Sequence, residues 1–219
     1  MYYLTRSLHK SYTALSGKKR IVSGIENIPE YGPLMIASNH NERSDPWVVS
    51  GVVPFTIHWI SKIELFSFKT MFYEARGEGH SVLYSVISAF LTKFVVRHSK
   101  TIPFDRNNKL NRVNGKAKVE MKNIFSAGGC VGIFPQGTRK NDPKAKSSFL
   151  ILAKKQGVGV LIIKTGRNFI TISPLITAEE ISAIPYSVLK DMTIKILEYL
   201  SSPSEEIFSF SGCECTGTS

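Results

Sequence analysis

Short apolar runs alternate with segments of helical periodicity along most of the chain. Apolar runs bounded by polar or glycine residues predict strands at 33–38, 56–61, 130–134, 158–163 and 169–173, with a short strand or turn at 100–106. Apolar residues spaced three and four apart predict helices at 82–98, 109–127, 144–156 and 186–200. This alternation favours an α/β fold: a single domain with a largely parallel, mixed sheet flanked by helices.

Two terminal segments differ from the domain, which we expect to span residues 23–200. Residues 1–22 carry apolar side chains at helical spacing together with five basic residues and no acid. They predict a short basic amphipathic helix, which either contacts a membrane surface or packs on the domain. Residues 201–219 are polar, and we expect them to form a disordered tail.

The helix expected at 82–98 has a markedly apolar face. Its members are Leu83, Ile87, Phe90, Leu91 and Phe94. Such faces here and near 63–72 are suited either to core packing or to contact with acyl chains. The longest apolar-rich stretch, residues 81–96, is interrupted by Lys93 and is shorter than the ~20 apolar residues that cross a bilayer. We therefore expect a cytoplasmic protein that is peripheral on a membrane surface.

The charge is concentrated in two segments. The net charge is +11; residues 1–22 contribute +5 and residues 139–167 contribute +7, which leaves −1 for the rest of the chain. A concentrated excess of this kind indicates an anionic partner, such as a membrane surface, a phosphorylated substrate or nucleic acid. Nucleic acid is disfavoured, because the basic residues are not interleaved with aromatic ones. Three sparse cysteines form no disulfide framework and no metal site, and favour a reducing compartment.

His40 and Asp45 stand five residues apart in "ASNHNERSDPW", residues 37–47. Histidine is the usual general base near neutral pH, and a carboxylate on its far ring nitrogen orients it. The two can meet if the intervening loop folds back. Asp45-Pro46 predicts a helix start, with Asp45 as N-cap and Pro46 as the first helical residue. The alternative is an N-capping aspartate beside a surface histidine.

Two later segments offer groups for binding an anion. In "PFDR", residues 103–106, Arg106 presents a planar guanidinium suited to phosphate, or else forms a surface ion pair with Asp105. In "FPQGTR", residues 134–139, Gly137 permits a tight turn beside Thr138 and Arg139. That turn either cradles an oxyanion or simply ends a strand.

Taken together, these blocks resemble the glycerolipid acyltransferases, typified by the lysophosphatidic acid acyltransferases. "NHNERSD" resembles their Asn-His-x4-Asp motif, "IPFDR" their second motif and "FPQGTR" their third, with "KIELF" at 62–66 lying between the first two. The resemblance covers residues 24–175. Four blocks in the right order are very unlikely to agree by chance.

The resemblance implies a reaction and roles for individual residues. A fatty acyl group would pass from a thioester of coenzyme A or acyl carrier protein to the free hydroxyl of 1-acyl-glycerol 3-phosphate, with no bound cofactor and no metal. His40 would be the general base and Asp45 would orient it. The candidates for substrate binding are Asn39, Arg106, Gln136, Gly137, Thr138 and Arg139. The implied partners are the membrane phospholipid surface, the lysophospholipid acceptor and, as the alternative donor to acyl-CoA, acyl carrier protein.

Several positions depart from the family pattern. Gln136 replaces the usual glutamate, Glu42 stands where serine is common, and Gly159 and Ile162 replace two prolines. These departures leave other functions open: an acyltransferase for another lysophospholipid or for glycerol 3-phosphate, or a non-catalytic protein that binds anionic lipid on the same fold.

Overall fold

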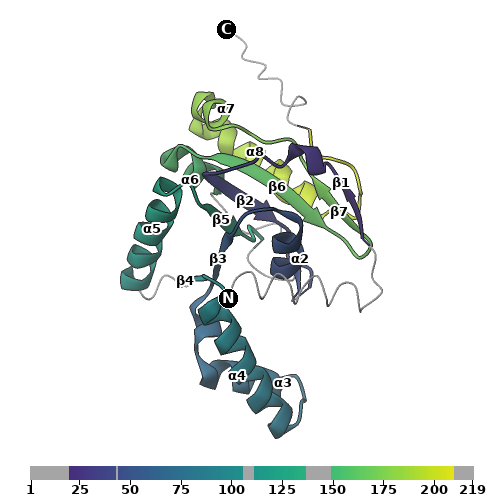
Figure 1. Cartoon of the computed structure of the whole chain (residues 1–219), viewed down its shortest axis with the longest axis vertical. Coiled ribbons are helices and arrows are strands. Elements are labelled where there is room, and N and C mark those ends of the chain that lie inside the picture. Colours follow the sequence, from purple (N-terminus) through teal and green to yellow (C-terminus); the bar gives the residue numbers. More distant parts are fainter. Residues whose placement is uncertain (1–19, 43, 106–110, 137–148, 210–219) are drawn as a thin grey trace.

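A seven-stranded sheet forms the centre of the protein (Figure 1). The computed structural model describes residues 20–42, 44–105, 111–136 and 149–209. The strand order is β1-β7-β6-β2-β5-β3-β4. All neighbouring strands are parallel except β6 and β7, which are antiparallel. The strands are β1 (Ile21–Ser23), β2 (Leu34–Ser38), β3 (Ile57–Lys62), β4 (Ile102–Phe104), β5 (Cys130–Ile133), β6 (Gly159–Thr165) and β7 (Phe169–Ile172).

Helices lie on both faces of this sheet, so the predicted α/β class is confirmed. The α-helices are α2 (Asp45–Val52), α3 (Phe68–Gly77), α4 (Val82–His98), α5 (Asn111–Ser126), α6 (Phe149–Gln156), α7 (Ala178–Ala183) and α8 (Tyr186–Ser201). Two short 3-10 helices are η1 (Ile25–Asn27) and η2 (Ile63–Phe66). Strand β1, helix α7 and the 3-10 helices were not expected from the sequence.

The central strand β2 divides the core into two halves. Met35 and Ala37 point to one face, where they pack with α5, α6, α7 and α8. Leu34 and Ile36 point to the other face, towards α2. Successive side chains of a strand point to opposite faces, so the unbroken apolar run of β2 fits a strand that is covered on both sides.

Helices α3 and α4 form a pair that projects away from the sheet (Figure 1). Along the chain they come between β3 and β4, which pair with each other in the sheet. Helix α4 packs mainly on α3 and η2. The predicted helix 82–98 matches the bounds of α4. Its five predicted face residues, however, are exposed rather than packed in the core.

The chain after α8 packs on the domain as far as the structure describes it. Tyr199 donates a hydrogen bond to the carbonyl of Glu206, its ring contacts Phe208, and Thr171 donates to the carbonyl of Glu205. Residues 202–209 therefore have contacts that their polar sequence did not indicate. At the other end, residues 21 and 22 lie in β1, while the amphipathic helix expected before them lies outside the described residues.

Candidate active site

The site lies at the carboxyl ends of three neighbouring strands. Strand β2 lies between β6 and β5 and is parallel to both, so the chain leaves all three strands at one edge of the sheet. The loop from Asn39 to Ser44 follows β2, while Thr165 ends β6, and Phe134 follows β5 directly. Sites of α/β proteins form at this edge, because loops from several strands meet there.

Asn39 ties the end of β2 to the end of β6. Its side-chain Nδ2 donates to the carbonyl oxygen of Thr165 at 2.7 Å, and its Oδ1 accepts from the backbone N–H of Thr165 at 2.7 Å. Asn39 is only 1% exposed. Both polar ends of this amide are therefore used within the protein, and we expect Asn39 to act on a substrate through the loop that it holds.

The loop between His40 and Asp45 folds back around the carboxylate of Asp45. Asp45 Oδ2 accepts from the backbone N–H of Asn41 at 2.6 Å and of Glu42 at 2.7 Å, and Asp45 Oδ1 accepts from the hydroxyl of Thr165 at 3.2 Å. Helix α2 begins at Asp45 itself, with Ser44 before it as N-cap, one residue earlier than the sequence indicates. The carboxylate thus serves the preceding loop and does not cap its own helix.

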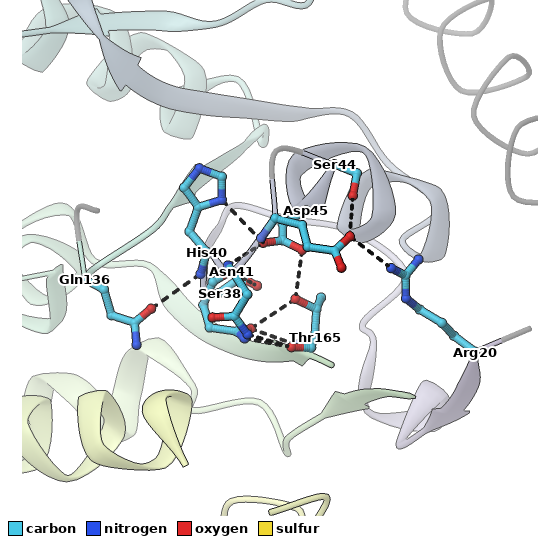
Figure 2. Close-up of polar contacts among 10 residues, drawn as sticks. Arg20, Ser38, His40, Asn41, Ser44, Asp45, Gln136 and Thr165 are labelled. Carbon is cyan, nitrogen blue, oxygen red and sulfur yellow. Dashed lines mark hydrogen bonds and ion pairs between the residues drawn. The ribbon is translucent and has the colours of Figure 1, made fainter. Parts of the chain in front are cut away.

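This fold-back brings His40 and Asp45 together (Figure 2). His40 Nδ1 lies 3.4 Å from Asp45 Oδ2, while the side chains are 22% and 3% exposed, respectively. In the described part of the chain no group bonds to His40 Nε2, and Figure 2 shows that nitrogen pointing away from Asp45. A buried carboxylate behind a partly exposed imidazole is the arrangement that orients a general base.

A stack of three rings supports the other side of His40. The ring of Phe134 lies 4.4 Å from that of His40, and the ring of Trp59 lies 4.5 Å from that of Phe134. Trp59 also donates from its indole N–H to the hydroxyl of Ser50. A Cβ at Gly132 would lie 2.5 Å from the indole, so this glycine leaves the room that the stack occupies.

Gln136 connects the backbone of the loop to helix α8. Its Oε1 accepts from the N–H of His40 at 3.4 Å, and its Nε2 donates to the hydroxyl of Ser201 at 2.8 Å. Ser201 in turn donates to the carbonyl of Leu197, so its oxygen is left to accept. An amide suits this position because it can donate, whereas the glutamate typical of the family pattern, when ionised, cannot.

Glu42 has a cation beside it. Its carboxylate lies 3.8 Å from the guanidinium of Arg20 and accepts from the hydroxyl of Ser44 at 3.2 Å. Arg20 also donates to the carbonyl of Gly166. The acid that looked out of place in the motif is therefore paired with a cation from the start of the chain.

Lys164 is a cation buried within the domain. Its ammonium donates to the hydroxyl of Ser202 at 2.8 Å and lies over the ring of Tyr199. Burial lowers the pKa of Lys164, while the nearby charge of Glu206 acts in the opposite direction. This residue accordingly belongs to the packing of the C-terminal segment, although it contributes to the basic excess of residues 139–167.

Four of the predicted site residues lie outside the described residues: Arg106, Gly137, Thr138 and Arg139. Their neighbours are held firmly. Before Arg106, the buried Asp105 and Asn114 exchange two hydrogen bonds of 2.9 Å, which join the end of β4 to α5. Within the described ranges, no three histidine, cysteine or acidic side chains are grouped so that they could hold a metal ion.

Sequence reasoning did not identify Thr165, Trp59 or Ser201 as parts of the site. Thr165 ends a strand that extends two residues beyond its predicted limit, and a polar residue after an apolar run was the available signal. Trp59 and Ser201 reach the site through the strand order and the packing of α8, which no local pattern displays.

A family model matches part of the chain. Residues 72–177 match the family model described as Acyltransferase. The matched stretch includes "IPFDR" and "FPQGTR" and begins after His40 and Asp45. No curated protein sequence matches the chain at a significant level.

Among solved structures, the 1-acyl-sn-glycerophosphate (LPA) acyltransferase PlsC from Thermotoga maritima has a similar fold. It aligns with a TM-score of 0.58 and 20% sequence identity, over 94% of this chain and 81% of that chain. The resemblance to the glycerolipid acyltransferases that the motifs indicated is thereby confirmed: residues 72–177 match the family model, and the fold is similar to that of PlsC.

Proposed function

We propose that the protein transfers a fatty acyl group from a thioester to the free hydroxyl of 1-acyl-glycerol 3-phosphate, forming phosphatidic acid. The observation that carries the proposal is the contact of His40 with the buried carboxylate of Asp45 at the carboxyl edge of the sheet. The family match and the activity printed for PlsC support acyl transfer as the reaction and a lysophosphatidic acid as the acceptor.

In the proposed reaction His40 Nε2 takes the proton of the acceptor hydroxyl as its oxygen attacks the thioester carbonyl. The tetrahedral intermediate then collapses, the carbon–sulfur bond breaks and the thiolate leaves. The proton held by His40 passes to that sulfur, so the base is regenerated. Asp45 stabilises the imidazolium that forms between the two steps and fixes its orientation. No acyl-enzyme is required, because the substrate oxygen is the nucleophile.

The acceptor phosphate is assigned to Arg106 and Arg139, whose guanidinium groups suit bidentate contacts with phosphate. Gly137 and Thr138 complete the binding turn in this proposal. Gln136 and Asn39 act as supports, since the hydrogen bonds of both side chains are made within the protein. The donor is acyl-CoA or an acyl carrier protein thioester, and the reaction uses neither a metal nor a bound cofactor.

The test is an assay of the purified full-length chain against a panel of acceptors. Lysophosphatidic acid, other lysophospholipids and glycerol 3-phosphate are each paired with acyl-CoA and with acyl carrier protein donors. We expect release of the thiol and formation of phosphatidic acid, with lysophosphatidic acid as the best acceptor.

Other outcomes of the same assay have distinct meanings. Turnover confined to another lysophospholipid or to glycerol 3-phosphate would keep the reaction and overturn the acceptor. Binding of lysophosphatidic acid without turnover for any donor would overturn the reaction and favour the non-catalytic lipid-binding alternative.

An Arg139→Ala variant should raise the acceptor KM, because it loses a phosphate contact.

A further inference from the structure

Helix α4 has the opposite arrangement of side chains from an ordinary surface helix. Its fully buried residues are small, namely Ser85 and Ala89. The large apolar residues point outwards, and we call the following five the outer face of α4: Leu83 (70% exposed), Ile87 (50%), Phe90 (62%), Leu91 (54%) and Phe94 (45%).

The helical geometry makes this face continuous. At about 100° per residue, Leu83, Ile87, Phe90 and Phe94 fall within about 60° of one another, almost opposite Ser85 and Ala89. The small residues let α4 pack closely on α3, and this packing leaves the large residues exposed, although the ring of Phe94 contacts that of His98 on the same helix. Of the eighteen large hydrophobic side chains that are exposed in the described part of the chain, eight belong to α4.

A cluster of this kind marks an interaction surface, since isolated exposed apolar residues are ordinary but contiguous ones are not. The pair α3–α4 projects from the sheet, so the outer face of α4 is not part of the domain core (Figure 1). No helix of the described residues is long and apolar enough to cross a membrane. The 17 residues of α4 form a rod about 25 Å long, which is suited to lying on a surface.

Charge decides between the candidates for what covers this face. Residues 81–100 contain no acid, and Lys93 and Arg97 lie in the second half of α4. A second copy of α4 would therefore bring only further cations and no acid to pair with them. Residues 1–19 are also basic and have no acid. An anionic lipid surface is complementary to α4, because it accepts the apolar outer face and attracts the cations Lys93 and Arg97.

We propose that the outer face of α4 docks the protein on an anionic phospholipid surface. The apolar side chains enter the boundary between headgroups and acyl chains, and Arg97 pairs with lipid phosphates. Helix α3 leaves the sheet just after β3, at the edge where His40 follows β2, so docking would bring this edge towards the membrane. The docking surface does not depend on the proposed reaction.

The test is co-sedimentation of the full-length protein with vesicles of phosphatidylcholine, with and without phosphatidylglycerol. The variant Leu83→Asp/Phe90→Asp removes two side chains of the outer face. Its matched control, Val119→Asp/Ile194→Asp, makes the same kind of change at two exposed residues of α5 and α8. Because all four residues are exposed, we expect both variants to keep the circular dichroism spectrum and Tm of the wild type.

We expect the α4 variant to bind vesicles with phosphatidylglycerol at least about tenfold more weakly than the wild type, and the control within about twofold. Arg97→Gln should weaken binding to these vesicles and leave binding to phosphatidylcholine alone unchanged. His40→Ala should bind as the wild type does, so a failure of the proposed reaction would leave this result intact.

Three results would overturn the proposal. The first is equal vesicle binding by the α4 variant and its control. The second is loss of binding on deletion of residues 1–19 while the α4 variant binds normally, which would assign docking to that segment. The third is a dimer that the α4 variant converts to a monomer without any change in vesicle binding, which would make this face an interface between copies.

Discussion

The sheet edge around His40 and the helix pair α3–α4 depart in opposite ways from the usual distribution of side chains. At the edge, polar residues are buried: Asn39, Asp45, Gln136 and Thr165 are almost inaccessible to solvent. In α4, large apolar residues are exposed. A buried polar group costs free energy unless it is hydrogen-bonded, and an exposed apolar cluster costs free energy until something covers it.

The two regions resolve these costs differently. The buried polar groups are partnered inside the protein, through bonds that join the loop after β2 to β6 and α8. The outer face of α4 remains exposed in the described part of the chain, where Phe94 contacts only His98 of the same helix. The internal hydrogen bonds of the sheet edge hold the loop around His40 in one geometry. The uncovered face of α4 is instead suited to contact with another surface. Substitutions of the same kind in the two regions test whether the regions differ in this way.

The largest effect is expected from His40→Ala, with His98→Ala on α4 as its matched control. Loss of the proposed base should lower kcat about 100- to 10,000-fold with little change in stability, because His40 is partly exposed. His98 is exposed at the end of α4, so its loss should leave kcat within about twofold on a dispersed substrate. Steady-state assays measure both values. Turnover that survives in His40→Ala would show that the base lies elsewhere.

The next effect compares one substitution on two helices, Ile196→Ala on α8 and Ile87→Ala on α4. Ile196 is fully buried against the sheet, so its truncation should lower the free energy of unfolding by about 2–5 kcal/mol. Ile87 is half exposed, and its truncation should cost less than about 1 kcal/mol. Urea unfolding measures both. Equal losses would mean that the outer face of α4 is covered in the folded protein.

These two helices also show how far local pattern predicts structure. Periodicity located both α4 and α8 and identified the apolar face of each. It could not say whether a face meets the sheet, because that depends on where the chain places the helix. Helix α8 packs on the sheet. Helix α4 comes between β3 and β4 along the chain and projects away from the sheet.

The residues of the site also differ in whether a local pattern predicts them. The motif "NHNERSD" predicted both His40 and Asp45, and the structure brings the two together. Their supports come from β6, β5 and β3, through Thr165, Phe134 and Trp59. Strand order brings these residues together, and strand order is a property of long-range pairing that no short segment displays.

A smaller effect is expected from Asn39→Ala, with Asn41→Ala as its matched control. Truncation of Asn39 leaves the backbone N–H and C=O of Thr165 without their side-chain partner in a buried place, which should cost about 1–3 kcal/mol. Asn41 is exposed, and its side chain reaches the same carbonyl only at 3.5 Å, so its truncation should cost less than about 0.5 kcal/mol. Thermal unfolding of the two variants tests this difference, and similar losses would argue against Asn39 as the tie between β2 and β6.

The smallest effect is expected from Glu42→Gln, which removes a charge from the exposed side of the same loop. The Glu42 side chain is 45% exposed and lies 3.8 Å from the guanidinium of Arg20, whose side chain is 9% exposed and also donates to the carbonyl of Gly166. An ion pair with one well-solvated partner at that distance contributes little. We expect a loss of less than about 0.5 kcal/mol in the free energy of unfolding, and still less at high salt because ions screen the pair. A loss above about 1 kcal/mol that persists in high salt would mean that the pair is shielded from solvent. Glu42 would then belong with the buried, internally partnered groups, and the contrast between the two regions would extend across the whole loop after β2.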